Sequence, residues 1–417
     1  MPMTSTDKSI SSTRPVWVVL LSGCLILCLA FGVRSSYGLF VKPISDELNW
    51  GREVLAFSLA LQNLLWGAAQ PFAGMVADRY GAGRVLVLSA LIYTGGIILG
   101  AMDYSPIASH LGPGFFVGIG LSGTTFGVVL AVIGRSVSEE KRSLALGIAT
   151  ASASLGQFLI IPFGSSLLQS FGWQDALLIL AGLLMLIIPA AYFLRGGSSV
   201  SDQLAISESP SPENSLSMVD VLKEASRHRG YWLLIAGFFV CGFHLAFITV
   251  HFPSYAIDKG LAPEVGAWTL ALVGLANIFG SYTAGALGGA YRKKYLLSGI
   301  YLARSVAILA FILIPASTVS FLVFGFVMGL LWLSTVPLTS GLVAQIFGPK
   351  YMGTLFGFVF FSHQVGSFIG VWLGGVLYDS TQSYDLVWWA SIFLGVFAAM
   401  VHWPITDQPL RRFSQTA

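Results

Sequence analysis

Twelve apolar runs, each long enough to cross a lipid bilayer, take up most of this 417-residue chain. A membrane-spanning helix needs about 20 apolar residues. Only 10% of the residues are charged, whereas soluble domains carry about 25%. The runs lack the ten-residue alternation of an outer-membrane barrel. We therefore predict an all-α membrane protein with twelve transmembrane helices, over residues 16–40, 54–76, 85–102, 113–134, 143–167, 174–194, 231–254, 266–290, 296–316, 320–345, 353–377 and 386–405.

The distribution of Lys and Arg predicts the orientation in the membrane. With the N-terminus inside, 17 of the 22 basic residues fall in cytoplasmic segments, three in outer segments, and Arg34 and Arg304 within spans. Cytoplasmic loops are enriched in Lys and Arg, so we expect a multi-pass protein of the inner (plasma) membrane with both termini in the cytoplasm. No basic stripe is interleaved with aromatic residues, so no nucleic-acid partner is expected.

A polar segment divides the apolar runs into two sets of six. Residues 196–229 are rich in Ser, Pro and Glu, a composition typical of flexible linkers. We predict a cytoplasmic linker here, ending in a short amphipathic helix over Met218–Arg229. The expected organisation is a six-helix bundle over 16–195, the linker, a second six-helix bundle over 230–405 and a cytoplasmic tail over 406–417.

The two sets of six runs repeat each other. Arg34 and His244 lie 210 positions apart, and a glycine precedes each of them by two residues. The same offset relates three further glycine pairs: Gly147 and Gly357, Gly156 and Gly366, Gly164 and Gly374. A duplicated six-helix unit is typical of parallel-repeat transporters, whose site lies between the halves near the bilayer midplane. The repeat therefore predicts a transporter.

Ionisable and polar residues inside the spans predict what such a site would bind. An arginine in mid-membrane costs about 3 kcal/mol, so it usually faces a watery cavity or a partner. No Asp or Glu lies in the middle of any span, and a guanidinium fits a carboxylate well. The expected ligand is a small organic anion, a mono- or dicarboxylate. The candidate substrate-binding residues are Arg34, Tyr37, Gln157, His244, Asn277, Ser281, Arg304, His363 and Gln364.

Other roles remain open for the two arginines. Arg34 lies nearer the outer end of its helix, so it could instead pair with a neighbouring helix, act in gating, or extend toward the interface. Arg304 lies deeper, and it could hydrogen-bond the backbone carbonyls of a neighbouring helix.

The loop between the second and third runs carries a motif of known type. Its sequence, Gly74-Met-Val-Ala-Asp78-Arg79-Tyr-Gly81-Ala-Gly-Arg84, closely resembles the signature of the major facilitator superfamily. The resemblance implies two pseudo-symmetric six-helix bundles, and a gating motif consisting of Gly74, Asp78, Arg79, Gly81 and Arg84. In this interpretation Gly74 permits close helix approach, Gly81 permits a tight turn, and Asp78 helps to close the inner side. Ala82-Gly83 stands where the family usually has basic residues.

Further stretches resemble the monocarboxylate transporter and oxalate/formate antiporter-like branch. They are F-G-V-R-S-S-Y-G-L-F-V-K-P-I in the first run, F-F-V-C-G-F-H-L-A-F in the seventh and F-F-S-H-Q-V-G-S-F in the eleventh. The animal-type carriers of this branch have D-x-x-x-R on helix 8, where this chain has Asn277 and Ser281. Proton coupling would therefore need a histidine, such as His244 or His363. Anion exchange without a proton is the alternative.

Three other functions were considered. An exporter of an amphipathic or toxic compound would suit the aromatic-rich spans, but two buried arginines disfavour it. A non-transporting membrane sensor would need a signalling domain, which the short polar linker cannot supply. An enzyme is disfavoured because H-E-x-x-H, G-x-S-x-G and clustered metal ligands are all missing. We therefore expect no catalytic residue, metal or cofactor, and a monomer in the lipid bilayer with protons as a candidate coupling ion.

Overall fold

A computed structural model describes residues 15–102, 105–137, 139–194, 218–348 and 352–410, and this part of the chain is helical without strands. The first half contains α1 (Val16–Ser36), η1 (Tyr37–Phe40), α2 (Val41–Leu48), α3 (Arg52–Tyr80), α4 (Ala82–Met102), α5 (Pro106–Ser109), η2 (His110–Phe116), α6 (Val117–Thr124), α7 (Phe126–Ser136), α8 (Glu139–Leu184) and α9 (Ile187–Phe193). The second half contains α11 (Met218–Arg227), α12 (Arg229–Asp258), α13 (Pro263–Ala290), α14 (Lys293–Leu313), α15 (Thr318–Leu331), α16 (Thr335–Phe347), α17 (Met352–Thr381) and α18 (Asp385–His402).

The helices account for the twelve predicted spans. Ten segments of the described chain are helical, long and apolar enough to cross a membrane. The longest, Ala145–Phe193, contains two helices because the backbone turns at Gly172, where φ is +80°. The 29-residue α3 is also long enough to cross. The predicted all-α membrane architecture is thus confirmed, and a helix occupies Met218–Arg227 at the end of the predicted linker.

Three predicted spans differ from the observed helices. The first span was expected to end at residue 40, but helical structure continues through η1 and α2 to Leu48. The fourth span is broken at Thr125, which has an extended backbone, so that α6 and α7 are separate helices. The tenth span is broken between Leu331 and Thr335. Apolar runs show that a segment crosses the membrane, but they do not show local breaks within it.

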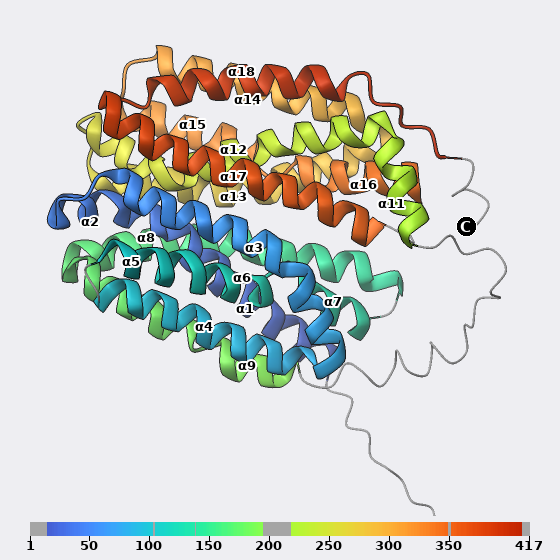
Figure 1. The fold of residues 1–417 in the computed structure, drawn as a ribbon, viewed down its shortest axis with the longest axis horizontal. Coiled ribbons are helices and arrows are strands. Elements are labelled where there is room, and N and C mark those ends of the chain that lie inside the picture. The colour runs from blue at the N-terminus through green and yellow to red at the C-terminus, as the bar shows by residue number, and fades with distance from the viewer. Residues whose placement is uncertain (1–14, 103–104, 138, 195–217, 349–351, 411–417) are drawn as a thin grey trace, which may run out of the picture.

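Figure 1 shows the helices of the first half lying along one side of the molecule and those of the second half along the other. Repeated glycines explain the tightest crossing in each half. A Cβ atom on Gly156 of α8 would lie 2.0 Å from the Cys28 carbonyl oxygen of α1. On the equivalent Gly366 of α17 it would lie 2.0 Å from the Phe239 carbonyl oxygen of α12. Small residues allow helix backbones to approach closely in membranes, so the glycine repeat reflects two equivalent helix crossings.

Candidate functional site

Arg34 of α1 points to the second transmembrane helix of its own half. Its Nη2 donates to the Asn63 Oδ1 atom of α3 over 2.5 Å, and its guanidinium lies 4.9 Å from the centre of the Trp66 ring. The Arg34 Nε atom is buried and has no hydrogen-bond partner in the part of the chain that the structure describes. A buried donor without a partner is costly. The site therefore has hydrogen-bonding capacity for a ligand at an arginine that already lies against an aromatic face.

Helix α17 of the second half contacts the Trp66 ring beside Arg34. The Trp66 ring contacts the Phe360 ring edge-on at 5.9 Å between centres, and Phe360 stacks on His363 at 5.7 Å. His363 Nδ1 lies 3.3 Å from the Gln364 Oε1 atom. The Gln364 Nε2 atom is buried and has no partner. Within the described residues, each half thus contributes one buried donor without a partner, and a series of ring contacts through Trp66, Phe360 and His363 connects the two.

Breaks in two equivalent helices lie beside the arginines. Thr125, at the break between α6 and α7, accepts a 2.9 Å hydrogen bond from Trp66 Nε1. Thr335, 210 positions later, lies at the break between α15 and α16. Its Oγ1 atom is 3.3 Å from the Cys241 Sγ atom. Discontinuous helices of this kind expose backbone polar groups in the membrane and are common at transporter binding sites.

Arg304 of α14 is held by one of these breaks. Its Nε and Nη2 donate to the Leu331 carbonyl oxygen over 3.1 and 2.6 Å. Nη2 also donates to the Trp332 carbonyl oxygen. Nη1 donates to the Cys241 Sγ atom over 3.4 Å. The side chain is fully buried. Its positive charge therefore lies at the C-terminal end of α15, where a helix attracts cations.

Asn277, Ser281 and Gln157 lie together between α8 and α13. Asn277 Nδ2 donates to Ser154 Oγ over 2.8 Å, and Ser281 Oγ donates to Asn277 Oδ1 over 3.0 Å. The same Oδ1 accepts from the Leu333 amide over 2.9 Å at the break before α16. Gln157 Nε2 donates to the Leu270 carbonyl over 3.4 Å. These amides therefore link the two halves and satisfy backbone groups at a helix break.

His244 and Tyr37 are turned to other neighbours. His244 is fully buried and its Nε2 donates to the Ser391 carbonyl of α18 over 2.8 Å. The Tyr37 hydroxyl is buried without a partner, and its side chain lines a small cavity with Ser58 and Ser109. The structure thus brings Arg34 close to α3 and α17, whereas its repeat partner His244 packs on α18.

The predicted gating motif lies at the turn between α3 and α4. Gly81 ends α3 with φ at +91°, a conformation that favours glycine. Arg84 Nη1 is 3.5 Å from the Tyr80 carbonyl, and the exposed Arg79 lies over the Tyr80 ring. Among the described residues, no atom of a neighbouring element lies within 4 Å of the position a Cβ would take on Gly74. The side chain of Asp78 lies outside the described residues.

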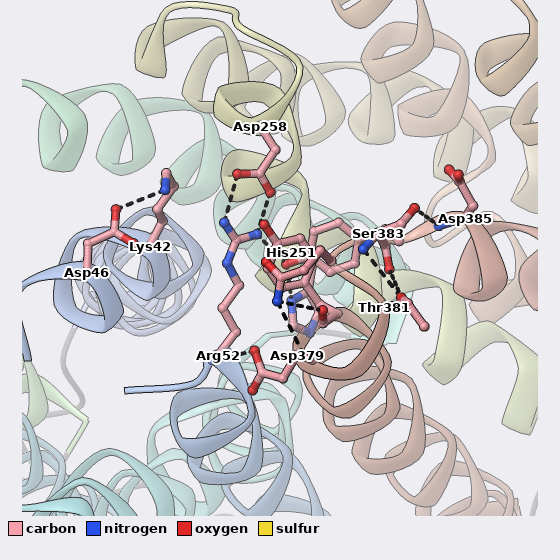
Figure 2. A network of polar contacts seen from close by, with 12 residues as sticks. Lys42, Asp46, Arg52, His251, Asp258, Asp379, Thr381, Ser383 and Asp385 are labelled. Atoms are coloured by element: carbon pink, nitrogen blue, oxygen red, sulfur yellow. Dashed lines mark hydrogen bonds and ion pairs between the residues drawn. The ribbon is translucent and has the colours of Figure 1, made fainter. Parts of the chain in front are cut away.

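The opposite end of the bundle carries a cluster of polar contacts between the halves (Figure 2). Arg52, the first residue of α3, makes two hydrogen bonds to the Asp258 carboxylate at the end of α12, at 2.5 and 2.8 Å. The Asp379 carboxylate of α17 accepts from the backbone amides of Arg52 and Glu53 over 2.9 and 2.8 Å. It caps a helix that begins 327 residues earlier in the chain. We call these residues, with Tyr384 and His251, the clasp.

Gly51 makes this capping possible. It precedes α3, and a Cβ atom there would lie 2.4 Å from the Asp379 Oδ2 atom. The remaining clasp contacts connect α3 to α18 and α12. Arg52 Nη1 donates to the Tyr384 hydroxyl over 2.9 Å, and His251 Nδ1 lies 3.1 Å from the same hydroxyl. The end predicted to face outside is therefore closed by charge pairing between the halves.

Sequence reasoning missed several of these residues. Asn63 and Trp66, the partners of Arg34, were absent from the candidate list, although an Asn inside an apolar run is itself a signal of a functional site. Asp258 and Asp379 were also missed. Each is an acid at the predicted outer end of a span, where charges are ordinary, so only the three-dimensional contact with α3 distinguishes them.

Comparisons with known proteins agree with the fold and with the family resemblance. Among curated relatives, monocarboxylate transporter 4 of Rattus norvegicus is 26% identical and covers 89% of this chain and 79% of its own. The oxalate:formate antiporter of Oxalobacter formigenes is 25% identical, and the match covers 90% of this chain and 88% of the antiporter. These relatives confirm the predicted branch resemblance.

A solved structure and a family model cover most of the chain. A bacterial homologue of the human lysosomal transporter Spinster, in an inward-facing and unoccupied conformation, has a TM-score of 0.76 at 16% identity. It covers 96% of this chain and 98% of its own. The model of the Major Facilitator Superfamily matches residues 23–370 and 260–416. This family consists of membrane transporters, not enzymes, as the sequence predicted. The chain is a multi-pass membrane protein that belongs to the Major Facilitator Superfamily.

Proposed function

We propose that this transporter moves a small organic anion, a mono- or dicarboxylate, across the inner membrane, and that Arg34 is the group that holds the carboxylate. The observation that carries the proposal is the state of the Arg34 donors. One of them binds Asn63, and the buried Nε has no partner. A carboxylate could accept from such a guanidinium in a charge-assisted hydrogen bond, which is stronger than a neutral one.

Arg304 is the weaker candidate for this role. Its side chain makes four hydrogen bonds to Leu331, Trp332 and Cys241. A ligand would have to displace these bonds and leave the helix-end carbonyls without a donor. We therefore assign Arg304 to the support of the break between α15 and α16. His244, which donates to Ser391, is assigned to the packing of α12 against α18.

The proposed mechanism is alternating access. The substrate would reach Arg34 and Asn63 from one half and His363 and Gln364 from the other, and so draw the two halves together. The clasp closes the outer end, while the space beside Gly74 at the opposite end is open. This combination supports a conformation that opens to the cytoplasm. The orientation itself, with both termini cytoplasmic, rests on the distribution of basic residues.

Coupling can take two forms. In proton symport, His363 is the histidine next to the proposed site, because its ring lies between Phe360 and Phe238 and beside Gln364. In anion exchange, a second carboxylate would occupy the same donors on the return step. The two forms differ in their response to a pH gradient.

Counterflow in proteoliposomes tests the proposal. The purified protein is assayed with a panel of mono- and dicarboxylates, with and without a pH gradient. We expect exchange of at least one carboxylate, and a loss of apparent affinity of roughly 10- to 100-fold in Arg34→Ala, the cost of one or two charge-assisted hydrogen bonds. Arg227→Ala, at an exposed position of α11, is the control. Full transport of every carboxylate by Arg34→Ala would overturn the assignment.

A further inference from the structure

Aromatic rings from both halves pack on one another next to Arg34, whose guanidinium lies over the Trp66 ring. Phe31, one turn before Arg34 on α1, contacts Trp66 edge-on at 5.7 Å and Phe126 at 4.6 Å between ring centres. On the other side, Trp66 contacts Phe360 of α17 at 5.9 Å. We call these four residues the ring belt. Phe31, Phe126 and Phe360 are only partly buried, so faces or edges of these rings remain available to a ligand.

The polar end of Trp66 is already engaged. Its Nε1 atom donates to the Thr125 hydroxyl over 2.9 Å, which fixes the ring in place. The Arg34 guanidinium lies over the Trp66 ring, and the rings of Phe31 and Phe360 contact it at steep angles of 74° and 76°. A ligand at Arg34 would therefore meet an apolar, rigid wall on the sides that the guanidinium does not cover. Fixed aromatic rings bind apolar and aromatic groups in edge or offset contacts.

Little positive charge lies near the ring belt. Arg34 is the one arginine or lysine of the described chain that is in ring contact with the belt. Arg304 is occupied by backbone carbonyls and His244 by Ser391. A second carboxylate on the ligand would meet the amide of Gln364 and the ring of His363 in place of a second arginine or lysine of the described chain, and the loss of its hydration there is costly. The site therefore favours an anion with a single negative charge.

From the ring belt and the Arg34 guanidinium, whose Nε has no hydrogen-bond partner among the described residues, we infer that the preferred substrates are monocarboxylates with an aromatic or bulky apolar body, such as arylalkanoates. The inference rests on the proposed function, because it assumes that Arg34 holds the carboxylate. In the bound state, the carboxylate would accept from Arg34, and the body would lie between Trp66 of the first half and Phe360 of the second. The ring of the substrate would then complete the contact between the halves.

The test uses competition in the same proteoliposomes. Phenylacetate, acetate and succinate each compete against a transported labelled carboxylate. We expect phenylacetate to compete at concentrations at least tenfold lower than acetate, and succinate to be no better than acetate. Phe360→Ala should reduce the advantage of phenylacetate over acetate about five- to tenfold, the worth of one aromatic contact. Phe358→Ala removes a ring that is 50% exposed on the same helix and is the matched control.

The outcomes separate the two levels of the proposal. If acetate or succinate is transported and phenylacetate competes no better than acetate, the substrate preference is wrong while the anion-transport proposal stands. If none of the carboxylates is exchanged by a protein that elutes as a single folded species, the anion-transport proposal itself fails. Equal effects of Phe360→Ala and Phe358→Ala would show that the ring belt does not contact the ligand and would overturn the inference.

Discussion

Arg34 and Arg304 are both charges in the middle of apolar helices, yet their surroundings differ. Arg304 donates into the carbonyls that α15 leaves unpaired where it breaks. Arg34 has an amide and an indole ring as neighbours and keeps a buried Nε without a partner. The free-energy cost of placing an arginine inside the membrane marks both residues as unusual. The two residues differ in how many guanidinium donors already have partners. By this measure Arg304 supports a helix end, whereas Arg34 can still donate to a ligand.

This difference predicts unequal effects of substitution on stability. Arg304→Met leaves the Leu331 and Trp332 carbonyls without their donor, at a cost of roughly 2–6 kcal/mol if each unpaired group costs about 1–3 kcal/mol. Arg34→Met leaves only the Asn63 amide oxygen and should destabilise the protein less. Thermal unfolding of both variants in detergent measures this. A melting temperature of Arg304→Met equal to that of the parent would contradict the structural role.

The repeat predicted the depth of His244 in the membrane but not its direction. An offset of 210 places His244 at the helical position of Arg34, yet its Nε2 binds Ser391 on α18. A repeat constrains where a residue lies along its helix. The rotation of that helix is set by packing, here by Gly242 and Gly366 against the backbones of α17 and α12. Candidate residues could therefore be proposed from the sequence, while their partners required the structure.

At the scale of elements, apolar runs predicted the helices well because the membrane requires them. The corner at Gly172 and the turn at Gly81 also fall where glycines interrupt the runs. Interactions between distant helix ends were not predictable in this way. Asp379 caps α3 from 327 residues away, and no local pattern around Asp379 or Gly51 indicates this contact.

A second contact between distant elements lies at the opposite end. Asp407, after α18, accepts from Arg292 Nε and Nη2 at the start of α14, over 3.0 and 2.5 Å. Nearby, Lys294 Nζ donates to the Ile405 carbonyl over 2.8 Å. Arg292 and Lys294 place positive charge at a helix N-terminus, where it is unfavourable. The carboxylate of Asp407 offsets that charge and attaches the segment after α18 to α14.

This attachment should depend on pH in a defined direction. The hydrogen bond from Arg292 lowers the pKa of Asp407 below its ordinary value. The stabilisation is therefore complete above the ordinary carboxyl pKa and is lost as the pH falls through the lowered pKa. At neutral pH, Asp407→Asn should lower the melting temperature by about 2 °C. The difference between parent and variant should disappear in strong acid; a difference that persists there would contradict the ion pair.

At the scale of the whole molecule, the position of the cross-half contacts defines which end is closed. The clasp joins α3 to α12, α17 and α18. Nearby, a Cβ on Gly38 would lie 2.2 Å from the Thr249 carbonyl oxygen. At the far end of α3, the space beside Gly74 is open. We propose that the close approach at Gly74 forms in the other conformation of the alternating-access mechanism, in which the inner ends come together and the clasp releases.

If the clasp holds the outer end closed, breaking it should shift the population toward the conformation that opens outward. Arg52→Gln removes the pair with Asp258 and the contact with Tyr384. A shift of about 1.4 kcal/mol changes the ratio of the two conformations tenfold. The reporter is Ser254→Cys, buried on α12 one turn after Val250, in a background where Cys24, Cys28 and Cys241 are replaced by Ser. We expect a membrane-impermeant maleimide to label this cysteine about tenfold faster in Arg52→Gln.

Lys42→Gln is the matched control for this measurement. It breaks an ion pair at the same end of the molecule, between Lys42 and Asp46 at 2.9 Å, but both residues belong to α2 (Figure 2). Because this pair does not join the two halves, its loss should leave the labelling rate unchanged. Equal labelling rates in Arg52→Gln and Lys42→Gln would mean that the Arg52–Asp258 pair does not hold the outer end closed. Closure would then rest on the apolar packing around Gly38 and Thr249, and substitutions there would be the next to change the rate.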